Sequence, residues 1–149
     1  MSAMQRITHL YLSAISLLES YLTPLFGLGI RGYLAWVFFR SGLTKIQTWD
    51  STLWLFENEY SVPYLAPELA AWMATATELT LPVFILLGLG SRVAATVLFL
   101  FNAIAVISYP DLDIGAVRQH YLWGALMLVL VFHGAGKLSL DTLFKRRCQ

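Results

Sequence analysis

The chain has 149 residues, of which 58% are hydrophobic and only 13% are charged. Soluble domains carry about 25% charged residues, so this composition excludes an ordinary soluble domain and predicts one domain that needs lipid. The formal net charge of +1 argues against nucleic acid as a partner. The single cysteine, Cys148, excludes an internal disulfide or a C-x-x-C dithiol.

Residues 1–23 are predicted to form an amphipathic helix that lies at the membrane interface. Apolar side chains recur at helical spacing from Ile7 to Tyr21, but serines and threonines interrupt them too often for a membrane span. Pro24 is expected to begin the first span. Residues 24–149 then form a second unit, a membrane domain with a short basic tail.

The first span, predicted over residues 24–45, carries three cations, Arg31, Arg40 and Lys45. A cation at the centre of a bilayer costs roughly 2.5–3.5 kcal/mol even on insertion scales. At about 100° per residue, Arg31 and Lys45 share one face of the helix and Arg40 lies nearly opposite. We therefore expect Arg31 to face the protein interior and Arg40 to snorkel to the surface.

The rest of the chain predicts three more spans, over residues 68–87, 92–109 and 120–136. Residues 46–66 leave the membrane and contain a short helix, ended by Pro63 and Pro67, that folds onto the mouth of the bundle. Pro82 is expected to break the second span, residues 110–119 to form a polar loop, and residues 137–149 an amphipathic tail. Short connections make neighbouring spans antiparallel, so we predict an all-α, integral membrane four-helix bundle.

The distribution of Lys and Arg near the span ends predicts the orientation of the chain in the membrane. The side rich in these residues is expected to face the cytoplasm and includes Arg6, Arg92, Lys137 and the tail from Lys145. Both termini are then cytoplasmic, and the acidic loops face outward.

An acid inside the second span, Glu78, is the expected partner of Arg31. Intramembrane ionisable residues are candidates for functional sites, which favours a polar site for a substrate, a proton or a quinone headgroup. Buried ion pairs can also serve only to set the register of packed helices. Both interpretations of the Arg31–Glu78 pair stay open.

A second group of polar residues, Lys45, Tyr109 and His120, is predicted at the outer mouth of the bundle. Histidine changes charge near neutral pH, which is typical of a polar entrance that binds a ligand. The alternative is that these residues only contact the lipid headgroups at the interface. Gly42 and Gly124 share faces with Lys45 and His120, and glycine allows close helix approach, so these faces should turn inward.

Aromatic side chains are expected to wall a pocket in the bundle, namely Phe38, Trp72 and Trp123. No metal site is predicted, because His120 and His133 lie on opposite faces of one helix, about 20 Å apart. The residues assign no catalytic group, and whether the chain is an enzyme stays open.

Three stretches, IRGYLAWVFFRSGLTKI, TATELTLPVFILLGLGSR and GAGKLSLD, resemble the DoxX family of small bacterial and archaeal membrane proteins. The resemblance covers nearly all of the chain after residue 24 and implies four spans in the cytoplasmic (inner) membrane. The family takes its name from a subunit of an archaeal thiosulfate:quinone oxidoreductase, and other members are associated with thiol and oxidative-stress proteins.

The resemblance implies a membrane subunit of a redox-linked system, coupled to a quinone or to a partner enzyme, with quinone as the candidate cofactor. The expected partners are the lipid bilayer and a protein of a redox or metal pathway, and a homo-oligomer is an open alternative. The VPYL, SYP and HYLWG segments also resemble members that accompany peptide-modification and copper-handling proteins. The alternative function is therefore a non-catalytic helper or small transporter in a copper or oxidative-stress pathway.

Overall fold

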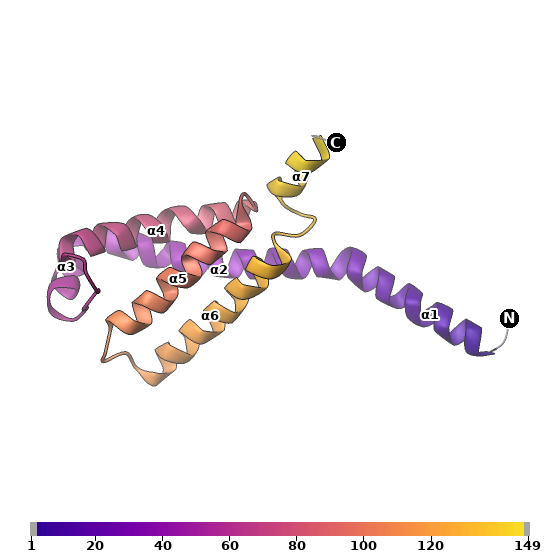
Figure 1. Ribbon diagram of the computed structural model, residues 1–149, viewed down its shortest axis with the longest axis horizontal. Coiled ribbons are helices and arrows are strands. Elements are labelled where there is room, and N and C mark those ends of the chain that lie inside the picture. Colours follow the sequence, from indigo (N-terminus) through magenta and orange to yellow (C-terminus); the bar gives the residue numbers. More distant parts are fainter. Residues whose placement is uncertain (1–2, 148–149) are drawn as a thin grey trace.

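The computed structural model describes residues 3–147, apart from the side chains of Ala3 and Arg146, as an all-α protein (Figure 1). Four helical runs in this part of the chain are long and apolar enough to cross a membrane. The predicted fold class, an all-α membrane bundle, is confirmed. Cys148 lies outside the described residues.

The helices follow the predicted order along the chain. The spans are α2 (Thr23–Gln47), α4 (Pro67–Leu87), α5 (Ser91–Ser108) and α6 (Ile114–His133). The predicted short helix after the first span is α3 (Trp49–Asn58), and the tail contains α7 (Leu140–Arg147). At the start of the chain lies α1 (Ala3–Leu17).

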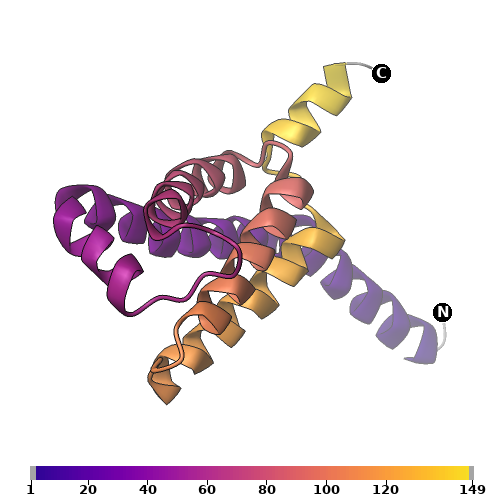
Figure 2. The same ribbon diagram turned by 60° about the vertical axis from the view of Figure 1, so that its left-hand side comes forward.

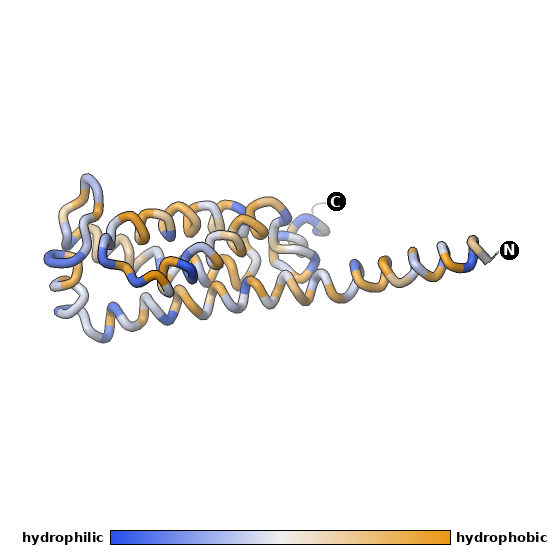
Figure 3. Tube along the Cα trace, turned by 90° about the horizontal axis from the view of Figure 1, so that it is seen from below, coloured by the Kyte–Doolittle hydropathy of each residue, from blue (hydrophilic) through white to orange (hydrophobic). Residues whose placement is uncertain are grey.

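We expected the first helix to end before Pro24 and a separate span to begin there. The structure shows instead that the helix continues through this point. A π-helical turn, Leu18–Leu22, joins α1 to α2, with the N–H of Thr23 donating to the carbonyl of Leu18 five residues earlier. The resulting helical run, Met4–Gln47, is about 66 Å long at 1.5 Å per residue, roughly twice the hydrocarbon thickness. Consequently α1 projects beyond the bundle (Figure 3), and its lying at the interface stays a prediction.

Two other boundaries differ from expectation. Pro82 does not break α4, which runs unbroken from Pro67 to Leu87. Pro82 deprives the Glu78 carbonyl of its helical donor, but its ring is fully buried, and packed membrane helices tolerate such prolines. The fourth span begins at Ile114, earlier than expected, because Asp113 caps it by accepting a hydrogen bond from the Gly115 amide at 2.8 Å.

The four spans pack as two pairs, α2 with α4 and α5 with α6. Figure 2 shows α5 and α6 side by side, crossing the other pair. Where the pairs meet, the core is built from buried side chains of all four spans, including Leu34, Ile85, Leu98 and Met127. Toward the end that carries α3 the two pairs diverge (Figure 1).

Arg31 is fully buried, but the predicted Arg31–Glu78 pair is wrong. Its Nη1 donates to the carbonyl of Leu86 at 3.3 Å and its Nη2 donates to the carbonyl of Leu138. These bonds place the cation at the carboxyl end of α4, where the helix dipole favours positive charge. Gly42, which packs against Glu78, is eleven residues further along α2, about 16 Å away, so Arg31 lies too far from Glu78.

Arg31 instead ties the tail to the turn between α4 and α5. Gly88 has φ +70° at this turn, and a Cβ there would overlap Nη1 of Arg31, so only glycine suits the position. The carboxylate of Asp141 accepts hydrogen bonds from the amides of Gly90, at 2.8 Å, and Ser91, at 3.2 Å. Of the two interpretations of Arg31, these contacts favour the structural one.

Because α2 and α4 lie so close together, adding a single methyl group to a glycine of α2 should change the stability of the protein. A Cβ at Gly42 would lie 2.9 Å from two side-chain carbons of Leu79 and 3.1 Å from Cβ of Glu78, whereas a Cβ at Gly32 would have nothing within 4 Å. We expect Gly42→Ala to destabilise the protein by about 1–3 kcal/mol through overpacking. The matched control Gly32→Ala, in the same helix, should be neutral or slightly stabilising.

Thermal unfolding of the purified variants in detergent measures both effects. Equal unfolding temperatures for Gly42→Ala and Gly32→Ala would contradict the observed contact between α2 and α4.

Candidate functional site

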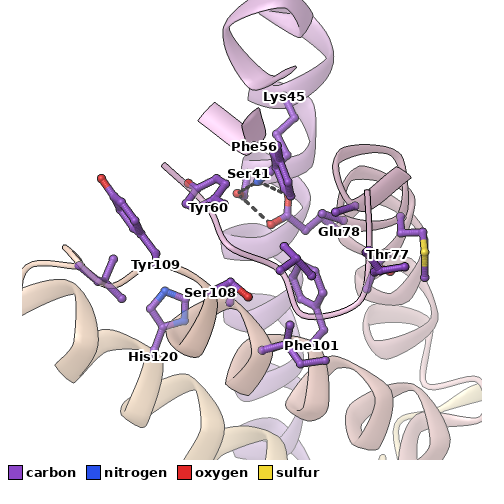
Figure 4. A pocket seen from close by; sticks show the side chains of 18 residues that line it. Ser41, Lys45, Phe56, Tyr60, Thr77, Glu78, Phe101, Ser108, Tyr109 and His120 are labelled. Atoms are coloured by element: carbon purple, nitrogen blue, oxygen red, sulfur yellow. Dashed lines mark hydrogen bonds and ion pairs between the residues drawn. The ribbon is translucent and has the colours of Figure 1, made fainter. Parts of the chain in front are cut away.

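A cavity of about 260 Å³ lies where the two helix pairs diverge, beneath α3 and the loop that follows it (Figure 4). All four spans contribute to its lining. Its walls are mostly apolar and aromatic, with Phe56, Tyr60 and Phe101 among the larger side chains. Polar groups reach it from two opposite sides, the α2–α4 wall and the α5–α6 wall.

The α2–α4 wall carries a buried ion pair. Nζ of Lys45 lies 2.7 Å from Oε2 of Glu78, and the side chains are only 19% and 7% exposed. Ser41 links the two, since its hydroxyl accepts from Nζ of Lys45 at 3.0 Å and donates to Oε1 of Glu78 at 3.2 Å. Each charge therefore has an opposite charge and a hydroxyl as partners, which offsets part of its desolvation cost.

The helical spacing explains this arrangement. Ser41 and Lys45 are one turn apart on α2 and so point the same way. Gly42 lets α4 approach at this level, with Glu78 facing it. A flexible lysine stem then carries the ammonium group to the carboxylate.

The α5–α6 wall carries His120, whose ring orientation is set by Asn102. The Asn102 side-chain amide donates from Nδ2 to the carbonyl of His120 at 3.0 Å. Its Oδ1 therefore faces Nδ1 of the imidazole, 2.7 Å away, and accepts a hydrogen bond from it. The ring also packs edge-on against Trp123, with 4.8 Å between the centroids. Asn102 on α5 thus makes a hydrogen bond between two spans.

Two phenols, Tyr60 and Tyr109, line the cavity, and an acid of the loop binds one of them. The hydroxyl of Tyr109 donates to Oε2 of Glu59 at 2.9 Å, and its ring packs edge-on against Tyr60, with 5.0 Å between the centroids. The hydrogen bond to Glu59 and its negative charge raise the pKa of Tyr109. Burial, followed by the charge of Glu59, raises the pKa of Tyr60. Both phenols therefore stay protonated at neutral pH.

The predicted mouth residues Lys45, Tyr109 and His120 all line this cavity, and their role in binding stays a prediction. His120 lies in the second turn of α6 rather than at its end, because the helix begins at Ile114. Arg31 is not among the lining residues.

The expected aromatic walls are wrong. Phe38 is buried against Trp123, with 5.5 Å between the ring centroids, and Trp72 packs on Trp49, with 4.3 Å between theirs. Neither Phe38, Trp72 nor Trp123 lines the cavity.

Sequence reasoning missed four polar lining residues, Ser41, Tyr60, Thr77 and Ser108. Ser41 could have been found, since it is one helical turn before Lys45 on the same face. Ser108 gives no such signal, because it is exposed to the cavity only through the divergence of the helix pairs.

The ion pair predicts that the effects of mutating Lys45 and Glu78 on the free energy of unfolding are strongly coupled. Removing one partner of a buried pair strands the other charge and costs about 3–5 kcal/mol, whereas replacing both by apolar residues is often neutral. We expect Lys45→Met to destabilise the protein strongly and Lys45→Met with Glu78→Met to recover most of the loss. Combining Arg31→Met with Glu78→Met should instead give additive losses, because these residues do not touch.

Thermal or chemical unfolding in detergent measures this double-mutant cycle. A large coupling between Arg31 and Glu78, with none between Lys45 and Glu78, would contradict the observed pairing.

Comparison with known proteins agrees with this architecture. Residues 26–110 match the family model DoxX. The chain is also 33% identical over 126 residues to an uncharacterized protein of Haemophilus influenzae, an alignment that covers 78% of this chain and 82% of the relative. No solved structure is significantly similar to the chain. With the family model covering more than half of its residues, the chain belongs to the DoxX family of membrane proteins.

Proposed function

We propose that this protein is the membrane subunit of a redox-linked system and that its cavity binds the ring of a quinone. The observation that carries the proposal is the ion pair of Lys45 and Glu78, which opens onto an apolar, aromatic cavity between the spans. Ligand sites combine apolar walls with a few fixed polar groups in this way. Oxidation or reduction of the ring requires an electron-transferring partner, and we propose that a protein partner supplies it.

The size of the cavity supports a ring rather than a larger ligand. Pockets for drug-sized ligands have volumes of about 300–1,000 Å³, and this cavity measures about 260 Å³. A single substituted ring suits that volume. A long isoprenoid tail has to remain outside, in the lipid.

The position of the lining residues supports entry from the membrane. Met73 on α4 and Ile104 on α5 both line the cavity, and they are also 51% and 47% exposed. They therefore mark a rim between two spans on the apolar surface. A molecule dissolved in lipid can enter there without crossing water.

The α2–α4 wall supplies the polar contact for the ring. The ammonium group of Lys45 has three N–H bonds, and it directs two of them to Ser41 and Glu78. The third can donate to a carbonyl oxygen of a bound quinone. Glu78 holds this donor in place, so we propose that its role is positioning.

Binding of a short-chain 1,4-benzoquinone to the purified protein tests this function. A ligand that binds only the folded state stabilises it by about 2.7 kcal/mol at a hundred times its Kd, so the unfolding temperature should rise. Lys45→Met with Glu78→Met should abolish the rise while leaving the fold intact. The control Arg40→Met should keep it, because Arg40 is exposed on the opposite face and lies over Trp36.

Quinones also dissolve in detergent micelles and can change the unfolding temperature without binding at the site. The comparison of the wild-type protein with the Lys45/Glu78 double variant controls for this effect. A rise of the same size in the Lys45/Glu78 double variant and in the wild-type protein would refute binding at this site, as would no rise in either.

We further propose that the cavity opens toward the outer half of the cytoplasmic (inner) membrane of a bacterium or archaeon, with both termini in the cytoplasm. Arg92 is in the first turn of α5, Lys137 lies between α6 and α7, and Lys145 is in α7. Figure 1 shows these parts of the chain at the end of the bundle opposite α3, and cytoplasmic ends of membrane proteins are enriched in such residues. A reporter enzyme that is active only in the cytoplasm should be active when it is fused after Gln149. Activity of a reporter that works only on the outer side would reverse the orientation.

A further inference from the structure

The α5–α6 wall of the cavity contains a polar side chain that has nothing to bond. Ser108 is 3% exposed and lines the cavity, and its Oγ has no hydrogen-bond partner among residues 3–147. Buried hydroxyls are normally hydrogen-bonded. Figure 4 shows Ser108 beside the cavity, between Phe101 and the ring of His120. The hydroxyl is therefore available to a ligand.

The neighbouring imidazole supplies a second group. Nδ1 of His120 donates its hydrogen to Asn102, so a neutral ring carries its lone pair on Nε2. Within the described part of the chain no hydrogen bond to Nε2 is formed. Among residues 3–147 no carboxylate is hydrogen-bonded to the ring, which bonds to the amide oxygen of Asn102 and makes an edge-to-face contact with Trp123. The neutral form of His120, which lines the cavity, thus has an unbonded acceptor nitrogen.

An acceptor and a hydroxyl on the same wall of the cavity specify the kind of group they can hold. A neutral imidazole nitrogen can only accept, so the ligand must bring a hydrogen to it. The hydroxyl of Ser108 can then donate to the oxygen that carries this hydrogen. A carbonyl oxygen satisfies Ser108 alone and leaves Nε2 facing a second lone pair, whereas a ligand hydroxyl satisfies both.

We propose that the cavity selects the hydroquinone form of the ring over the quinone, with one ring hydroxyl bound by Nε2 of His120 and Oγ of Ser108. The second ring oxygen then accepts from the remaining N–H of Lys45 on the opposite wall. This inference rests on the proposed function and adds which redox form of the ring is preferred. The step is binding alone, so no electron is transferred in it.

Competitive binding of three short-chain ligands, measured without oxygen at pH 8, tests the selection. At this pH the imidazole is neutral, since histidine has an ordinary pKa of about 6.5. The ligands are a 1,4-hydroquinone, the corresponding quinone and the dimethyl ether of the hydroquinone. We expect the hydroquinone to bind at least tenfold more tightly than the other two, because neither of them has a hydrogen to donate.

Two variants assign the preference to these residues. His120→Phe keeps a ring against Trp123 but removes the acceptor, and it should reduce the preference to less than threefold. Ser108→Ala removes no hydrogen bond of the unliganded protein, so it should fold normally and weaken the binding of both ring forms, because each offers an oxygen to the Ser108 hydroxyl. The control His133→Phe, on the exposed far end of α6, should bind like the wild-type protein.

The outcomes separate this inference from the function on which it rests. Quinone binding that depends on Lys45 and Glu78 but equals or exceeds hydroquinone binding would overturn the selection and keep the proposed function. A preference that survives His120→Phe, or ring binding that is unchanged by Ser108→Ala, would overturn the assignment to this wall. If neither ring form binds in a way that depends on Lys45 and Glu78, both proposals are wrong.

Discussion

A carboxylate that faces the interior of an apolar helix bundle persists only when a cation reaches it, because an isolated buried charge is expensive. Glu78 meets this requirement through Lys45, at 2.7 Å, with Ser41 bound to both. The position of the ion pair depends in turn on Gly42, which allows α4 to approach α2 at the level of Glu78. The polar wall of the cavity therefore depends on the packing of one helix pair.

Two of the three cations of the first span, Arg31 and Lys45, have different roles at opposite ends of the bundle. Arg31 donates to the carbonyls of Leu86 and Leu138 and so binds the end of α4 and the tail. Its planar group with several donors suits carbonyl groups that lie in different directions. Lys45, a compact charge on a flexible stem, reaches Glu78 at the cavity. The attachment of the tail and the proposed ligand site are thereby separated along α2.

Much of this fold could be predicted from the sequence, because long apolar runs with polar interruptions define spans and their ends. The faces of α2 were also predictable, since Arg31, Gly42 and Lys45 share one stripe. Which of the two cations meets Glu78 was not, because helical periodicity gives the direction of a side chain and not the axial register between two helices. That register comes from the contact of Gly42 with Leu79. The same limit hid Ser108, whose position at the cavity depends on the angle between the helix pairs.

The central claim is that the ion pair on the α2–α4 wall and the hydroxyl–imidazole pair on the α5–α6 wall form one ligand site. The most direct measurement is an experimental structure of the protein, determined in a lipid phase with a short-chain 1,4-hydroquinone. The account predicts one ring in the cavity, with an oxygen at Lys45 and another at Ser108 and His120. A ring bound elsewhere, or a Glu78 carboxylate that has left Lys45, would contradict it.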